Sequence, residues 1–323
     1  MTTAVHAAPV GVRRGAGIAA ALGSALAFSS SGPLIKPLLE AGWSVGAALL
    51  VRMSLAGILL APALILAIRR DPRMLRRHGV LIVGFGLTGV LGCQVFYFAA
   101  MQRMPVAVAL LIQYLAPVLL VLLAWARTRR APSRLVTVGS VAAIAGLILV
   151  ADIAGARFDP LGTVFALGAA VCVAVYFLIS ERAGDDLPPL ALASGGLLVG
   201  VAGTAVLAAL GVLPLAAPSV SVALLGVSVP WWIPLVWVGA VATTLGYALG
   251  VKAVPFLGSR LASFVGLSEV LFALGFAWLL LGETPSPMQA VGGAILLAGV
   301  VMVRLDARSA GEPRGEAATV PAP

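Results

Sequence analysis

The stretch LGSRLASFVGLSEVLFALGFAWLLLG, residues 257–282, decides the fold class of this chain. It carries only two charged residues, Arg260 near its start and Glu269 close to its middle. A helix that crosses the hydrocarbon core of a bilayer needs about 20 mostly apolar residues, each rising about 1.5 Å. The stretch therefore predicts a transmembrane helix with one carboxyl group near the centre of the bilayer.

Nine further stretches of the same kind fill most of the 323 residues, of which 61% are hydrophobic and only 10% are charged. Soluble domains contain about 25% charged residues, so this composition indicates a membrane protein. The alternation of apolar and polar residues that marks a membrane β-barrel is absent, which predicts an all-α membrane protein. The ten predicted spans are 16–38, 44–68, 79–101, 105–126, 134–152, 161–181, 190–212, 231–252, 257–282 and 286–304.

Basic residues fall almost entirely on one side of the predicted helices. Of the 21 lysine and arginine residues, 17 lie in the tails or at the span ends that border every second gap, and Arg52 lies deep within a span. The opposite side receives only Lys36, Arg103 and Arg157. Because loops rich in lysine and arginine stay in the cytoplasm, both termini are expected there. The net charge of +9 is thus assigned to membrane topology and not to nucleic acid. The composition favours a bacterial inner membrane.

The two halves of the chain repeat each other in order. Residues 97–105 (YFAAMQRMP) and 247–255 (YALGVKAVP) share Tyr and Pro at one offset. Each half would hold five spans, and because five is odd, the second half must enter the membrane from the opposite side. Inverted repeats of this kind are typical of transporters that bind substrate between the halves. The expected organisation is a disordered tail at 1–14, repeats at 15–152 and 153–306, and a disordered tail at 307–323.

These motifs resemble the drug/metabolite transporter superfamily, specifically its EamA-type branch. The resemblance rests on the two Tyr…Pro segments, on RMSLA at 52–56, and on LSEVLFA at 267–273 followed by Gly282-Glu283. The first half departs from the pattern, because Arg127-Thr-Arg-Arg stands where a Gly-Glu pair is expected. The resemblance implies ten transmembrane helices as two inverted five-helix repeats around a central cavity. It also implies transport, often outward, of a small metabolite such as an amino acid.

Glu269 and Arg52 are the charged residues expected to lie deepest in the bilayer. A charge there is costly, so Glu269 must face a cavity, pair with a base, or be protonated. It is a candidate for binding a proton or substrate, with a purely structural carboxyl as the alternative. Arg52 is a candidate partner for Glu269 or for a substrate carboxylate, and the alternative is an arginine that snorkels outward. Phe272 lies on the Glu269 helix face and would add an aromatic wall.

Polar side chains recur at helical spacing in four other spans and give further candidates for substrate binding. Residues three or four positions apart share a helix face, where they either line a cavity or bond to a neighbouring helix. We favour Gln113 and Tyr97, since an amide offers both a donor and an acceptor to an amino acid backbone. The other candidates in this group are Gln94, Tyr176, Thr243 and Tyr247.

Ser31 belongs to an interruption of the first span, Ser29-Ser-Ser-Gly-Pro33. Proline removes a backbone donor, so either a kink or a break that exposes backbone groups to substrate is expected here. Small residues also form stripes, at Gly84, Thr88 and Gly92 and at Gly292 and Gly299. Close helix packing explains both stripes, and a homodimer interface is the second interpretation.

The leading functional hypothesis is a secondary transporter that exports a small polar metabolite, most simply an amino acid, by alternating access. Proton coupling is one driver that the hypothesis allows. The alternatives are an uptake permease and a non-transporting membrane sensor or scaffold. The chain contains no phosphate-binding loop motif, and His6 and His78 lie outside the spans, so neither an ATPase nor an enzyme is expected. Cys93 and Cys172 lie within spans and imply no metal, and no cofactor is predicted.

Overall fold

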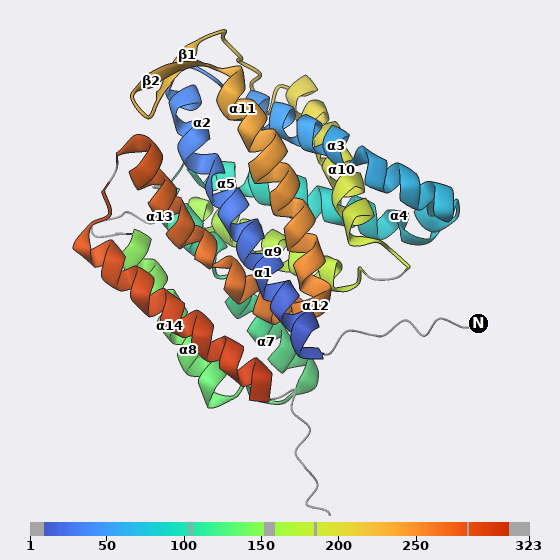
Figure 1. Ribbon diagram of the computed structural model, residues 1–323, viewed down its shortest axis with the longest axis vertical. Coiled ribbons are helices and arrows are strands. Elements are labelled where there is room, and N and C mark those ends of the chain that lie inside the picture. Colours follow the sequence, from blue (N-terminus) through green and yellow to red (C-terminus); the bar gives the residue numbers. More distant parts are fainter. Residues whose placement is uncertain are drawn as a thin grey trace, which may run out of the picture.

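The structure is a computed structural model that describes residues 10–101, 103, 106–151, 159–183, 186–282 and 284–309 (Figure 1). Most of these residues are helical. The helices are α1 Val10–Ser29, α2 Ser31–Glu40, α3 Val45–Arg70, α4 Met74–Gly84, α5 Cys93–Met101, α6 Val106–Gln113, α7 Ala116–Thr128, α8 Arg134–Ala151, α9 Pro160–Glu181, α10 Pro189–Ala209, α11 Trp232–Trp237, α12 Gly246–Gly266, α13 Ser268–Leu281 and α14 Pro287–Ser309. Two π-helical segments, η1 Phe85–Gly92 and η2 Val238–Leu245, join α4 to α5 and α11 to α12.

Seven helical segments of the described chain are long and apolar enough to cross a membrane. Three shorter apolar helices accompany them, at Arg134–Val150, Ser268–Leu280 and Pro287–Val303. Large apolar side chains also lie on the outer surface, where Val80 is 88% and Ile58 is 66% exposed. A surface of this kind is stable against lipid but not against water. The chain is therefore an integral membrane protein.

A short β-hairpin departs from the all-helical prediction. Strand β1, Ser221–Leu224, pairs antiparallel with β2, Val227–Pro230. The two residues of the turn, Leu225 and Gly226, have φ values of 52° and 75°, as a two-residue turn with both central residues left-handed requires. Val222 and Leu224 are buried in a cluster with α2 and the start of α3. The hairpin thus covers one end of these helices (Figure 1).

Two helices extend into the stretches expected as disordered tails. Helix α1 begins at Val10 and α14 ends at Ser309, beyond the limits expected from the sequence at 14 and 307. The rest of both tails lies outside the described residues, as do Pro105, Arg157 and Glu283.

Two helix interruptions follow directly from proline. Pro33 has no N–H to offer the carbonyl of Ser29, and the chain divides there into α1 and α2. Pro117 likewise has no N–H to offer the carbonyl of Gln113, and α6 ends at Gln113. The interruption expected at Ser31 is therefore present, and the one beside Gln113 is an additional feature.

A third interruption divides the quoted stretch of sequence. Gly258 has φ 73° and ψ 158°, which bends α12, and Leu267 separates α12 from α13. The N–H of Leu267 bonds to the carbonyl of Phe264 at 3.1 Å, three residues back instead of four. Glycine at position 266 has a low helix propensity and favours such a break. Residues 257–282 therefore do not form the single straight helix expected from their hydropathy.

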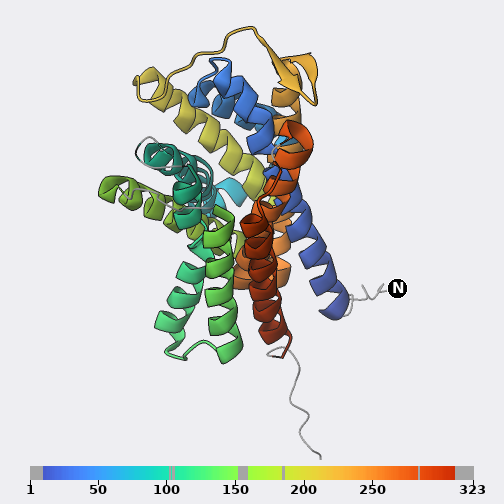
Figure 2. The ribbon, with the colours of Figure 1, turned by 90° about the vertical axis from the view of Figure 1, so that its left-hand side faces the viewer.

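Helices α8 and α14 pack side by side through glycine (Figure 2). A Cβ atom built at Gly299 would lie 2.5 Å from both the carbonyl oxygen of Gly139 and the amide nitrogen of Ala143. Gly292 likewise faces Gly146. The stripe of Gly292 and Gly299 thus packs against another helix of the same chain. Gly92 of the other stripe faces Cys172 of α9.

The ends of the helices fall into two groups. The hairpin lies at one end of the molecule, and the end of α14 and the start of α8 lie at the other (Figures 1 and 2). At this second end, Asp306 accepts a hydrogen bond from Ser133 and lies 3.9 Å from Arg260. These contacts join the start of α8, α12 and the end of α14, which are distant in the sequence.

Candidate functional site

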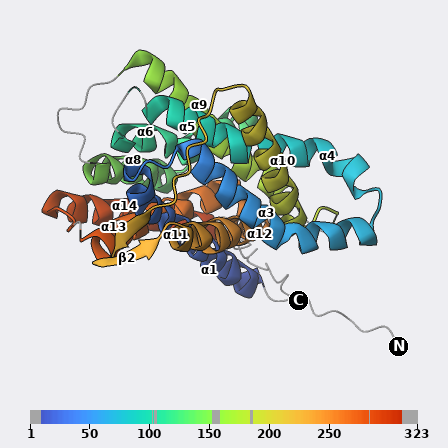
Figure 3. The same cartoon turned by 90° about the horizontal axis from the view of Figure 1, so that it is seen from above.

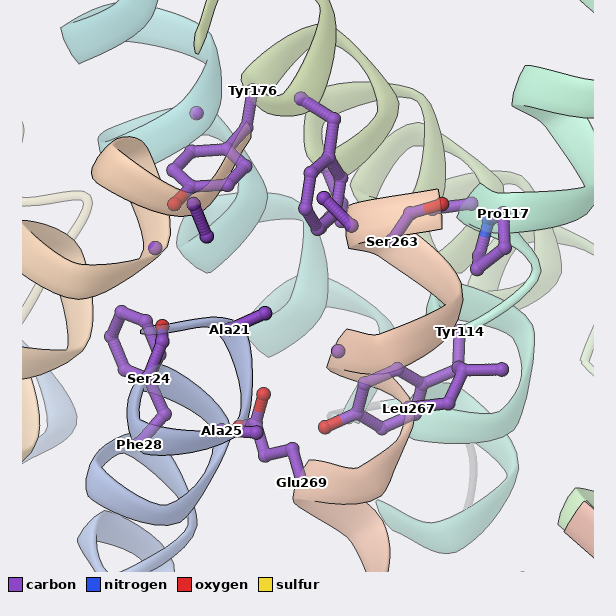
Figure 4. Close-up of a pocket in the computed structure, with 18 of the residues that line it drawn as sticks. Ala21, Ser24, Ala25, Phe28, Tyr114, Pro117, Tyr176, Ser263, Leu267 and Glu269 are labelled. Carbon is purple, nitrogen blue, oxygen red and sulfur yellow. The ribbon is translucent and has the colours of Figure 1, made fainter. Parts of the chain in front are cut away.

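A cavity of about 160 Å³ lies between helices from both halves of the chain. Its wall comes from α1, the η1–α5 junction, the α6–α7 junction, α9, α12 and the start of α13 (Figure 4). Most lining residues are apolar or aromatic, and a few are polar, which is typical of a site for a small organic molecule. This space, called the central cavity below, is the candidate functional site.

Glu269 lies in the wall of the central cavity, in the first turn of α13. The helix break at Leu267 places Glu269 in the first turn of α13, where the helix dipole favours a negative charge. Figure 4 shows its carboxyl group turned toward the cavity, between Ala25 of α1 and the hydroxyl of Tyr114. The carboxyl group expected deep in the bundle thus faces a cavity.

Tyr176 and Tyr247 also line the central cavity and belong to one aromatic cluster. Their ring centroids lie 6.1 Å apart, and the ring of Phe85 packs against them at 5.2 and 6.3 Å. The Tyr247 hydroxyl donates a hydrogen bond to the carbonyl of Gly89 at 3.4 Å. Aromatic packing of this kind fixes the position of the side chains and therefore the shape of the cavity.

Gln113 lies in the cavity wall at the end of α6. Its Oε1 atom is buried and has no hydrogen-bond partner. Leaving a buried acceptor unpaired costs about 1–3 kcal/mol, so such atoms are uncommon unless they serve a ligand. The amide oxygen of Gln113 is thus available to a bound molecule.

Arg52 and Ser31 lie together but outside the lining of the central cavity. Arg52 of α3 is only 9% exposed, and its Nη1 donates a hydrogen bond to Ser31 Oγ at 3.3 Å. Its Nε atom is buried without a partner. Arg52 and Glu269 attract each other electrostatically, but they do not form an ion pair. The arginine therefore holds the broken end of α2 against α3.

Four other residues singled out in the sequence lie outside this lining. Tyr97 packs beside Phe98 and a cluster around Ala100, and Gln94 is partly buried one turn earlier on α5. Thr243 is 1% exposed within η2, and Phe272 is partly buried on α13. Of the ten candidates, Glu269, Gln113, Tyr176 and Tyr247 are brought together around the cavity.

Tyr114 is a lining residue that the candidate set omitted. It lies in the gap between α6 and α7, and its ring borders both the central cavity and a second, mainly apolar cavity of about 410 Å³. By helical spacing, Gln113 and Pro117 share one face of this span, and Tyr114 lies beside that face. The break turns neighbouring residues toward one space, so the proline was the signal that could have identified it.

Small residues and hydroxyls complete the wall and were also omitted. A Cβ atom at Gly250 would lie 2.5 Å from the Tyr176 hydroxyl and 2.9 Å from Ser24 Oγ, so only glycine leaves room for both groups. Ser24 and Ser263 line the cavity as well. Serine and glycine are common in transmembrane helices, and nothing in the sequence distinguishes these from packing residues.

Comparison with known proteins fits this arrangement. The sequence pattern of the EamA-like transporter family matches residues 15–151 and 160–305. The chain belongs to the EamA-like transporter family. The sequence-based resemblance is confirmed, and this EamA-like transporter carries the family pattern twice, once in each half.

Curated relatives of this EamA-like transporter carry transport names. The threonine/homoserine exporter RhtA of Escherichia coli strain K12 is 30% identical over 69% of this chain and 70% of its own length. A probable terminal-alkyne amino-acid exporter of Streptantibioticus cattleyicolor is 31% identical over 85% of this chain and 89% of its own. The uncharacterized transporter YwfM of Bacillus subtilis strain 168 is 27% identical over 65% of this chain and 68% of its own.

A solved crystal structure has the same fold. It superposes on the EamA-like transporter with a TM-score of 0.69, at 22% identity, over 94% of this chain and 99% of the other. A cavity with one carboxyl group, within a membrane protein of a transporter family, is suited to binding a small molecule reversibly.

Proposed function

We propose that this EamA-like transporter exports a small amino acid from the bacterial cytoplasm by alternating access. The observation that carries the proposal is the central cavity with Glu269 in its wall, in a chain whose relatives are named as amino-acid exporters. The protein would lie in the inner membrane with both termini in the cytoplasm, as the distribution of basic residues favours.

The arrangement of the helices supports ten spans in two inverted repeats. The seven long segments and three shorter apolar helices follow the order of the ten predicted spans, although Trp232–Gly266 covers the eighth span and the start of the ninth. The π-helical segments η1 and η2 occur in the third and eighth spans, and the breaks at Tyr114 and Leu267 occur in the fourth and ninth. π-Helical turns and broken helices are frequent at functional sites. Corresponding irregularities in both halves favour a duplicated unit.

The composition of the cavity wall supports the same two-fold relation. The first, third and fourth spans of the first half contribute to it through α1, α5 with η1, and α6 with α7. The second half contributes its own first, third and fourth spans through α9, α12 and α13. A site between matching elements can open to either side when one half moves against the other.

Flux through reconstituted membranes tests the proposal. The purified protein in liposomes is expected to exchange labelled threonine or homoserine, and cells that produce it should hold less internal threonine. No flux of any amino acid would support a sensor or scaffold instead. Accumulation of threonine in the cells would support an uptake permease.

A further inference from the structure

Three of the hydroxyl groups in the wall of the central cavity donate their protons to backbone carbonyls. Ser24 Oγ donates to the carbonyl of Gly246 at 2.7 Å, and Ser263 Oγ donates to the carbonyl of Arg260 at 2.7 Å. Tyr247 donates to Gly89. A hydroxyl has a single proton, so these three oxygens can offer only lone pairs to a bound molecule.

Two further acceptors belong to residues that line the same space, one on each of the two broken spans. Gln113 Oε1 is buried and unpaired at the end of α6, and the Glu269 carboxyl lies at the start of α13. Figure 4 shows that the Glu269 carboxyl, the Tyr114 hydroxyl and Ser24 lie around one opening. The described part of the wall therefore holds five acceptor side chains, of which Glu269 supplies the carboxylate.

Positive charge is missing from the part of the wall that the structure describes. The lining contains no lysine, arginine or histidine, and Arg52 lies outside it with Ser31 as its partner. A substrate carboxylate would find no cation in this wall. A primary ammonium group has three donors and one positive charge, which suits several acceptors around a carboxylate.

We propose that the central cavity selects its substrate by a primary ammonium group held by Glu269 and Gln113, and that a free substrate carboxylate is dispensable. This inference rests on the proposed function and specifies its substrate class as small primary amines, of which amino acids are one kind. The volume of about 160 Å³ restricts the rest of the molecule to a small group.

Competition between threonine analogues tests the proposal. Flux of labelled threonine in proteoliposomes is measured in the presence of each of two unlabelled competitors. Threonine amide keeps the ammonium group but lacks the carboxylate, whereas N-acetylthreonine keeps the carboxylate but lacks the ammonium group. Threonine amide should compete within about threefold of threonine, and N-acetylthreonine at least about tenfold more weakly, because an unpaired acceptor rejects it. Equal competition by N-acetylthreonine, or none by threonine amide, would overturn the inference.

The same compounds are titrated in a thermal melting assay of the purified protein, which requires no transport. Ligands that bind the folded state raise the melting temperature. A rise with threonine amide but not with N-acetylthreonine supports the ammonium site even where flux is absent, in which case only the exporter proposal fails. No rise with threonine amide would overturn the inference by itself.

Substitution of Gln113 distinguishes a role in substrate binding from a role in helix packing. Gln113→Leu removes an acceptor that has no partner in the protein, so the melting temperature should not fall. The apparent KM for both threonine and threonine amide should rise about tenfold. An unchanged KM, or a fall in melting temperature with no change in selectivity, would assign Gln113 to packing and contradict the proposal.

Discussion

At the scale of single residues, Glu269 combines two features that affect its chemistry. It faces the central cavity, and it lies in the first turn of α13, where the helix dipole favours a negative charge. A carboxyl group in such a place can exchange a cation with the cavity without any movement of the backbone. Glu269 is therefore the residue through which proton coupling is most directly tested.

Glu269→Gln is expected to abolish flux driven by a pH gradient while the protein stays folded and inserted. The amide keeps the shape of the side chain but cannot take up or release a proton. Flux is measured in proteoliposomes with and without an imposed gradient. Glu181→Gln, at the exposed end of α9, is the matched control and should behave as the parent protein. Full pH-dependent transport by the Glu269 variant would remove it from the coupling step.

Arg52→Ala is expected to lower stability and to leave selectivity unchanged. The substitution removes the hydrogen bond to Ser31 that joins α3 to the start of α2, a loss of about 1–3 kcal/mol. The melting temperature should fall, whereas the ratio of the KM values for threonine and threonine amide should stay constant. A rise in KM for threonine alone would instead indicate that Arg52 binds the substrate carboxylate.

At the scale of elements, the α6–α7 break positions Gln113 and Tyr114. Pro117→Ala restores an N–H that can pair with the carbonyl of Gln113, which should make the helix continuous and turn one of the two side chains away from the cavity. Transport of threonine should fall at least about tenfold with no loss of melting temperature. Pro62→Ala, in an exposed part of α3, is the control and should transport normally. Normal flux in both variants would show that the break is not needed.

The contact between α8 and α14 depends on the absence of side chains. Gly299→Ala places a methyl group 2.5 Å from backbone atoms of α8, and overpacking of this kind costs about 1–3 kcal/mol. The melting temperature should fall. The same change at Gly275 of α13 meets nothing within 4 Å, and it should leave the melting temperature unchanged or raise it. Equal effects at the two positions would contradict the close packing of these helices.

At the scale of the whole molecule, the distribution of arginine predicts which end faces the cytoplasm. The loop between α7 and α8 contains Arg129 and Arg130 and is flanked by Arg127 and Arg134. The long segment before the hairpin carries no charge. The two regions lie at opposite ends of the molecule (Figures 1 and 2). Figure 3 shows the helices from the hairpin end.

Single cysteines at these two places give the orientation. Ala131→Cys and Ala217→Cys are introduced singly after Cys93 and Cys172 have been replaced by alanine, and transport is verified for each variant. In intact cells, a membrane-impermeant maleimide should label position 217 but not position 131, since only the former is expected outside. The reverse pattern would invert the proposed topology.

The family and the membrane class could be predicted from the sequence, and so could Glu269 as a residue facing a cavity. Hydropathy and the distribution of basic residues can be evaluated for each segment separately. The motif around Glu269 lies in one continuous stretch, so it can be recognised without knowledge of the tertiary structure. The break near Ser31 was predictable for the same reason, because Pro33 removes a donor locally. The β-hairpin was missed, since its four-residue strands give a weak signal beside long apolar helices.

The composition of the cavity could not be obtained from helical spacing. Tyr97 and Tyr247 occupy matching places in the repeated motif, yet only Tyr247 lines the central cavity. Tyr114 does line it, because a break turns it there. The sequence by itself determined where the chain crosses the membrane, because burial in lipid depends on local hydrophobicity. Only the tertiary structure decided which acceptors meet, because that depends on breaks and packing between helices far apart in the chain.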